Sequence, residues 1–177
     1  MAQAGGSSKC EEEEMSKEVS KNDLAAWDEL SKSHRRFIKA RMAFYQSEVD
    51  RVELIRRAMH TNDQALALSL ARYLSPTEHM QLFDEWVYWA TIDSCLPAVH
   101  NYILSLPKEW IMGRIEEAVE LRLREGDEID FRRYLELFCN LDRDLAAKLA
   151  RRALEHSDKE IQDAGRDYLS ALEGDQG

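Results

Sequence analysis

Histidines, cysteines and carboxylates are the side chains through which this chain would carry out metal or acid–base chemistry. The five histidines are His34, His60, His79, His100 and His156. None has a second histidine or a cysteine three or four residues away, the spacing that places two metal ligands on one helix face. The chain also lacks a glycine-rich phosphate loop and the GxSxG, HExxH and calcium-loop motifs. We therefore expect no metal, no cofactor and no catalytic residue.

Clustered carboxylates are the second candidate for chemistry. Glu116, Glu117 and Glu120 fall within two turns of one expected helix. Paired carboxylates act as acid and base only where an enclosing pocket separates their pKa values. A solvated helix face, with Arg124 four residues beyond Glu120, explains the cluster equally well. A non-enzymatic protein is therefore expected. An enzyme whose site is assembled from distant residues is the least favoured of the three functions considered.

Composition sets further bounds. The chain has 177 residues, is 44% hydrophobic and 33% charged, and carries a net charge of −10. Its three cysteines (Cys10, Cys95 and Cys139) are far apart, so a disulfide framework is not expected and a reducing compartment is. Cys95 and Cys139 have apolar neighbours, where buried, unreactive thiols are usual. No apolar run approaches the ~20 residues of a membrane span, so we expect a cytoplasmic protein with no membrane contact.

Apolar periodicity indicates helices along the chain. Residues 1–21 read as a disordered acidic arm, and residues 22–173 as a single all-helical domain. Within 22–60, apolar residues recur in steps of three and four, which fits one long basic helix or a helix pair with a break at Ser31-Lys32-Ser33. This repeat is short for a coiled coil, so packing onto the rest of the chain is the favoured prediction.

Residues 61–173 show shorter helices with clear end signals. Ser75-Pro76-Thr77-Glu78 and Ser157-Asp158-Lys159-Glu160 have the pattern of capping boxes, and Gly126 fits a helix end. No segment alternates with the period of a strand. About eight helices with short loops predict an all-α fold of stacked antiparallel helical hairpins, and an irregular helical bundle is the alternative.

An internal similarity supports the stacked hairpins. The segments Asp63–Arg72 and Asp142–Arg151 share aspartate, leucine, alanine and arginine positions at an offset of 79 residues. That offset is close to twice the ~40-residue period of two-helix repeats. In this respect residues 60–172 resemble the HEAT-like class of α-α repeats. The resemblance implies a short α-α superhelix that binds other proteins.

Charge is unevenly distributed. Residues 32–57 carry a net charge of +5, and the rest of the chain carries −15. The basic side chains Arg35, Arg36, Lys39 and Arg41 would serve a nucleic-acid or dimer contact. Nucleic acid is the less favoured partner because the whole chain is acidic. The basic helix is expected instead to lie along the acidic region, within the chain or in a homodimer.

Large aromatic residues coincide with the acidic region. The residues expected to bind a partner are Asp84, Glu85, Trp86, Trp89, Trp110, Glu116 and Glu117. Tryptophan supplies contact area and carboxylates steer a basic partner. Because successive helical residues lie about 100° apart, the run Trp86–Trp89 cannot face inward as a whole. The leading prediction is a protein–protein interaction module of the adaptor, regulator or toxin-neutralising type; the alternative is a nucleic-acid-associated helical protein that uses residues 32–57.

Overall fold

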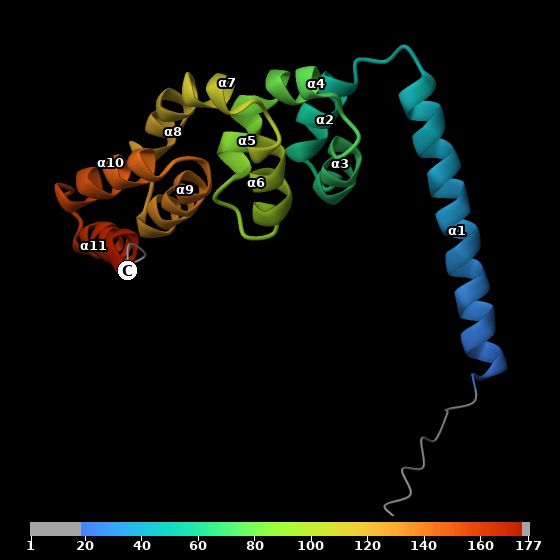
Figure 1. Ribbon diagram of the computed structural model, residues 1–177. Coiled ribbons are helices and arrows are strands. Elements are labelled where there is room, and N and C mark those ends of the chain that lie inside the picture. The colour runs from blue at the N-terminus through green and yellow to red at the C-terminus, as the bar shows by residue number, and fades with distance from the viewer. Residues whose placement is uncertain (1–18, 175–177) are drawn as a thin grey trace, which may run out of the picture. The chain divides into compact units, whose positions relative to one another are not determined.

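A computed structural model describes residues 19–174, in which the chain divides after Glu48 into two compact units. Every regular element of the described residues is a helix, so the predicted all-α class is confirmed (Figure 1). The helices are α1 (Lys21–Gln46), α2 (Arg51–Met59), α3 (Gln64–Ala71), α4 (Pro76–Gln81), α5 (Phe83–Trp89), α6 (Leu96–Leu104), α7 (Lys108–Met112), α8 (Ile115–Leu123), α9 (Glu128–Leu141), α10 (Arg143–Leu154) and α11 (Lys159–Gly174).

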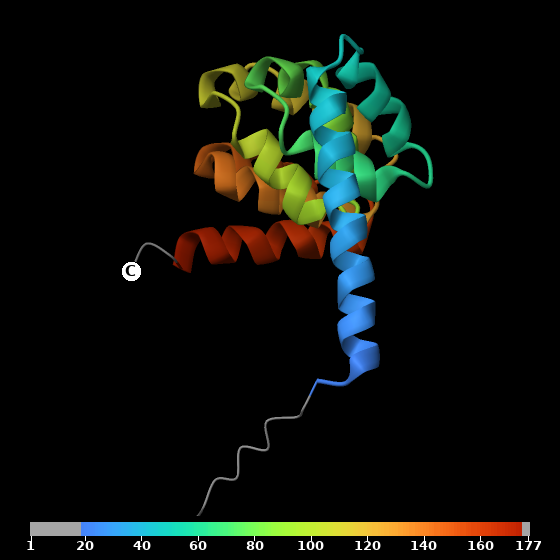
Figure 2. The same ribbon diagram turned by 90° about the vertical axis from the view of Figure 1, so that its right-hand side faces the viewer.

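The first unit contributes the single long helix α1. The Ser20 hydroxyl caps it by accepting a hydrogen bond from the Asp23 amide. The Asp23 carboxylate accepts one from the Ser20 amide, which completes a capping box. The predicted break at residues 31–33 is wrong, because the helix continues to Gln46 without interruption (Figure 2). Ser33 is accommodated on the surface, where its hydroxyl accepts a bond from Arg36 at 3.2 Å. The acidic run of the predicted arm lies outside the described residues.

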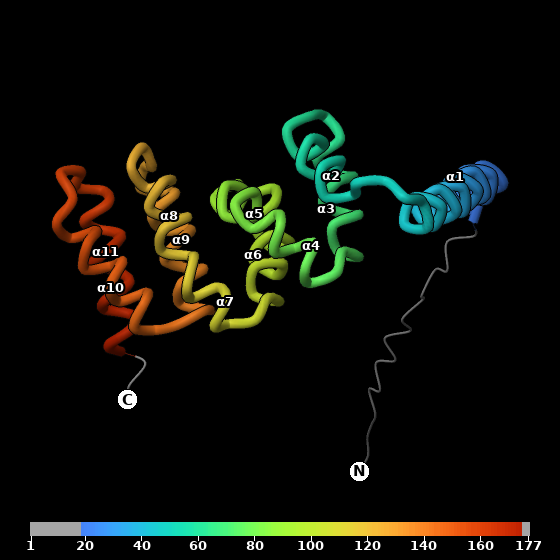
Figure 3. Tube along the Cα trace, turned by 90° about the horizontal axis from the view of Figure 1, so that it is seen from above, coloured from blue at the N-terminus to red at the C-terminus, as the bar shows by residue number. Residues whose placement is uncertain are grey.

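Four consecutive helical hairpins make up the second unit. They are formed by α2 with α3, α4/α5 with α6, α7/α8 with α9, and α10 with α11, and they follow one another in chain order (Figure 3). The first helix of the second and third hairpins is broken in two, at Leu82 and at Gly113-Arg114. These breaks, with the gap between α1 and α2, explain why the structure has more helices than the sequence predicts.

Helix ends follow the sequence signals in most cases. Ser75 and Glu78 form the predicted capping box at the start of α4. The predicted box at Ser157 is wrong, because Asp158 accepts the hydrogen bond from the Glu160 amide at 2.8 Å and so occupies the capping position. Aspartate and serine cap helices about equally well. Which of the two adjacent residues, Ser157 or Asp158, caps the helix therefore depends on the path of the loop before it.

One tyrosine hydroxyl crosses each boundary between neighbouring hairpins. Tyr102 of α6 donates to the Leu68 carbonyl of α3 at 2.7 Å, and Tyr134 of α9 to the Val87 carbonyl of α5 at 2.8 Å. Tyr168 of α11 donates to the Arg132 carbonyl of α9 at 3.2 Å. Burial raises the pKa of Tyr134, so its hydroxyl stays protonated and remains a donor.

The two segments of the internal similarity occupy unlike places. Asp63–Arg72 contains α3, the second helix of its hairpin, whereas Asp142–Arg151 lies in α10, the first helix of its hairpin. Asp142 caps its helix through its side chain, and Asp63 makes no such bond. The similarity therefore does not mark equivalent positions of a repeat, and the HEAT-like class stays a prediction.

The closest helix packing is between α10 and α11. Gly165 is buried, and a Cβ atom built on it would lie 2.6 Å from the Ala150 carbonyl oxygen and 2.9 Å from the Ala153 Cβ atom. Both distances are too short for real side chains. A side chain at residue 165 would therefore push the two helices apart.

We predict that Gly165→Ala destabilises the second unit by about 1–3 kcal/mol, because it overpacks this contact. Gly113→Ala is the matched control, since its added Cβ would lie 3.8 Å from its nearest neighbours. The control should leave the free energy of unfolding unchanged or raise it by less than about 1 kcal/mol. Urea unfolding followed by circular dichroism measures both, and equal stabilities of the two variants would contradict the packing described.

Two buried histidines, His79 and His100, make the fold sensitive to acid. Burial lowers the pKa of each, so both are neutral in the folded chain near neutral pH. The His100 ring lies 3.1 Å from the Ala90 carbonyl oxygen, and His79 packs between Trp86 and Tyr102. Protonation in the folded state would place a charge in a largely apolar environment, and the carboxylates of Glu78 and Glu136 offset only part of that cost.

We predict that the free energy of unfolding falls as the pH drops below about 6.5, where the unfolded histidines take up protons and the buried ones do not. The slope is at most about 1.4 kcal/mol per pH unit for each histidine, and it vanishes above that pH. His79→Phe should reduce the slope between about pH 6.5 and 5. An unchanged slope in His79→Phe would show that this histidine does not govern acid stability.

Candidate protein-interaction surfaces

The predicted aromatic surface is the first candidate, and the structure corrects it at Trp86. This side chain is 0% exposed and packs against His79 and Tyr102, with ring centroids 5.8 and 5.2 Å away. It lies on the inward stripe of α5 with Phe83 and Ala90, which are spaced three and four residues from it. The prediction that Trp86 contacts a partner is therefore wrong.

Trp89 and Trp110 are half-buried and are covered by neighbouring side chains. Trp89 lies against the His60 ring at 5.5 Å, and its indole nitrogen is buried without a hydrogen bond among the described residues. Trp110 packs edge-on against Phe83, and the Arg114 guanidinium lies 4.5 Å above its ring. The expectation that part of Trp86–Trp89 faces outward is confirmed by a different residue, Tyr88, which is exposed.

Basic residues of the second unit neutralise much of the predicted acidic surface. Glu85 accepts a bond from the His60 ring at 3.0 Å and lies 3.9 Å from the Arg56 guanidinium. Glu78 is paired with Arg51 at 2.9 Å. Part of the basic segment is thus used inside the second unit, against its acidic residues. Charge that is paired in this way contributes less to the attraction of a basic partner.

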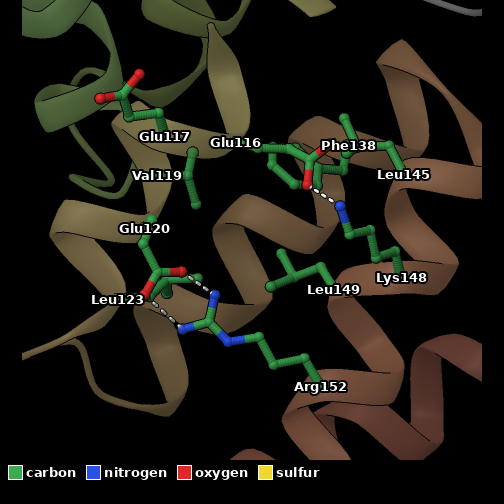
Figure 4. Close-up of a pocket in the computed structure, with 10 residues that line it drawn as sticks. All are labelled: Glu116, Glu117, Val119, Glu120, Leu123, Phe138, Leu145, Lys148, Leu149 and Arg152. Carbon is green, nitrogen blue, oxygen red and sulfur yellow. Dashed lines mark hydrogen bonds and ion pairs between the residues drawn. The ribbon is translucent and has the colours of Figure 1, made fainter.

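A charged hollow of about 360 Å³ lies between α8 and α10 (Figure 4). Glu116 and Glu120 of α8 face Lys148 and Arg152 of α10, and both ion pairs are formed. Arg152 reaches Glu120 through two nitrogens, one of them at 3.2 Å. Glu117 points away from these pairs.

Apolar side chains form the floor of this hollow. They are Val119, Leu123, Phe138, Leu145 and Leu149. Two of the three carboxylates that line the hollow are paired with its two cations, and Glu117 is the third. The exposed ion pairs contribute little to stability. Asp84 and Glu117 remain as predicted acidic residues that are exposed and that make no ion pair within residues 19–174.

The second candidate is α1, on which no residue is buried. Large apolar residues lie along one side of it, and we call them the apolar stripe of α1. They are Leu24, Trp27, Leu30, Phe37, Ile38, Phe44 and Tyr45. Trp27 is 67% exposed and Leu30 is 61% exposed. Together with Ser31, His34 and Arg35 they line a shallow hollow of the helix surface.

Basic side chains lie on another side of the same helix. Arg35, Arg36 and Lys39 are exposed and line one hollow together with Lys32 and Glu29. Arg41 is half-buried and lies 5.9 Å over the Phe37 ring. The four predicted basic residues are therefore on one helix, three of them fully accessible.

Sequence reasoning found the basic residues of α1 but did not assign its apolar stripe to a binding surface. The periodicity that predicts the helix was interpreted as the signal of a side that packs onto the rest of the chain. The signal available in the sequence was composition. Residues 21–46 contain tryptophan and phenylalanine but no glycine or proline. Burial itself is not encoded in a local pattern, because it depends on what the rest of the chain can offer.

The remaining site chemistry is limited. Within residues 19–174 no group of three or more histidine, cysteine or acidic side chains is arranged to hold a metal ion. Cys95 is buried as expected, whereas Cys139 is exposed, so the prediction that both thiols are buried is wrong for Cys139. No helix in the described part of the chain is both long and apolar enough to cross a membrane.

Comparison of the chain with protein-family models, with curated proteins and with solved structures found no match. The function is therefore inferred from the surfaces described above.

We predict that truncation of Trp86 destabilises the second unit strongly and that truncation of Trp27 does not. Trp86→Ala should lower the free energy of unfolding of the second unit by about 3–5 kcal/mol, because it opens a cavity in the core. Trp27→Ala should change it by less than about 0.5 kcal/mol, because the side chain is on the surface. Chemical unfolding followed by circular dichroism distinguishes them, and a mild effect of Trp86→Ala would return that residue to the list of surface candidates.

Proposed function

We propose that this chain is a non-enzymatic protein–protein interaction module and that α1 is its docking element. The observation that carries the proposal is the apolar stripe of α1, which is presented by a 26-residue helix with no buried residue. Exposed contiguous apolar surface is a mark of interaction sites in folded proteins. The binding mode that fits is an amphipathic helix that places one side in a groove or against another helix.

The second unit supports this role as a rigid carrier. Its hairpins are closed by buried aromatic residues and by tyrosine bonds between neighbours, and some of its acidic residues, Glu85 and Glu116 among them, are paired within the unit. The adaptor, regulator and toxin-neutralising types of function all remain compatible with such a module. The acidic aromatic surface expected from the sequence is a weaker candidate, since Trp86 is buried and Glu85 and Glu116 are paired.

Binding of nucleic acid through α1 is the second candidate. The observation that favours it is the hollow lined by Lys32, Arg35, Arg36 and Lys39. Such binding would depend on neutralised phosphates and would weaken steeply with salt. The net charge of −10 opposes it, which is why protein binding is the preferred function.

We predict that Leu30→Glu reduces capture of a specific partner protein from a lysate of the source organism by about tenfold or more, because it removes an apolar side chain that the partner would cover and adds a charge. The captured protein is identified by mass spectrometry and bound again in purified form. Ala25→Glu adds the same charge on the opposite side of α1 and serves as the matched control, with a change of less than about twofold. Equal capture by both variants would exclude the apolar stripe as the docking surface.

A further inference from the structure

The apolar stripe of α1 needs an occupant, and the charge pattern of the helix identifies one. We propose that α1 pairs with α1 of a second copy of this chain as an antiparallel two-helix coil. The inference rests on the proposed function, since it uses the same side of α1, and it names the partner.

A seven-residue repeat can be assigned along α1, with four apolar and three polar residues at its core positions. With Leu24 at the first core position (a), the core positions a and d alternate along the helix. They are occupied by Leu24, Trp27, Ser31, His34, Ile38, Arg41 and Tyr45. Leu30, Phe37 and Phe44 fall at the flanking position g. Two-helix coils bury a and d in the centre and place g and e at the two edges of the contact.

Charge favours the antiparallel direction. Residues 21–31 carry one lysine and three carboxylates, whereas residues 32–46 carry five basic side chains and no carboxylate. Parallel pairing would align like with like and would set Arg41 against Arg41 of the second copy at a core position. Antiparallel pairing places the acidic half of each helix beside the basic half of the other. Complementary charge selects the orientation of a contact more than its strength.

One antiparallel register pairs suitable residues in the central core layers and along both edges, while each outer core layer sets Leu24 against Arg41 of the second copy. In it Trp27 packs against Ile38 of the second copy, and Ser31 lies beside His34 of the second copy at the centre. Along the g edge, Leu30 meets Phe37 of the second copy. Along the e edge, Asp28 meets Arg35 of the second copy.

Each of these contacts occurs twice, because the pair has two-fold symmetry. The polar central layer fixes the register, since shifting it would bury serine or histidine against apolar side chains. Nearly the full length of α1, about 39 Å, takes part. Arg35 and Asp28 are exposed and so are accessible to a second copy.

The test is a charge exchange at the e edge of the purified full chain, measured by sedimentation equilibrium. The wild type should show a monomer–dimer equilibrium. Asp28→Arg and Arg35→Asp should each weaken dimerisation by about tenfold or more, because each makes both edge pairs repulsive. An equimolar mixture of the two variants, and the double variant, should regain the wild-type association because opposite charges face each other again.

Neighbouring residues supply matched controls. Glu29→Arg and Arg36→Asp make the same changes of charge at position f, on the side of α1 that faces away from the second copy. These controls should shift dimerisation by less than about twofold. Circular dichroism of every variant shows whether α1 remains helical, so that loss of the helix is not mistaken for loss of the contact.

Three results would overturn the inference. The first is a wild type that stays monomeric up to about 0.5 mM. The second is a stronger association of Asp28→Arg, because a parallel pair would place residue 28 beside Asp23 of the second copy. The third is a failure of the mixture to regain association. None of them bears on whether Leu30→Glu loses a different captured protein. A monomeric wild type with a Leu30-dependent partner would leave the proposed function in place and reject the second copy.

Discussion

An amphipathic helix is stable in water only when its apolar side is covered, and this constraint governs both units of the chain. Short isolated helices gain too little from backbone hydrogen bonds to persist alone, so packing of the apolar side supplies most of their stability. The hairpins of the second unit meet the requirement internally, since each of α2–α11 buries at least one residue. No residue of α1 is buried, and its function is inferred from that difference.

The same constraint explains where the aromatic residues lie. Trp86 is positioned by its spacing from Phe83 and Ala90, and it fills the space between His79 and Tyr102. A bulky indole supplies apolar area that the small residues of neighbouring helices do not. Its indole nitrogen has no hydrogen-bond partner within residues 19–174.

Most helices and the cap at Ser75 were predictable from local patterns, whereas the cap before α11 and the surfaces were not. Ser75 and Glu78 form the box that their spacing predicts, because the bonds involved join residues three apart. The breaks at Leu82 and Gly113 have only weak local signals, since one is a buried leucine and the other a single glycine. The pairing of Glu85 with His60 joins residues 25 apart in the chain and depends on how two hairpins meet. No periodicity reports such a contact, and this is why the acidic surface was overestimated.

The tyrosine bonds between hairpins have a consequence for how the protein tolerates change. Each acceptor is a main-chain carbonyl, of Leu68, Val87 or Arg132, and a carbonyl is present whichever side chain that residue carries. Mutation on the acceptor side therefore preserves the bond as long as the backbone stays helical, whereas the donor must be tyrosine. The joints between hairpins are accordingly constrained by residue type at the donor, and at the acceptor only by the packing of that residue's own side chain, which is tight at the buried Val87. Sequences that diverge from this one can therefore keep the same bond with a different acceptor residue.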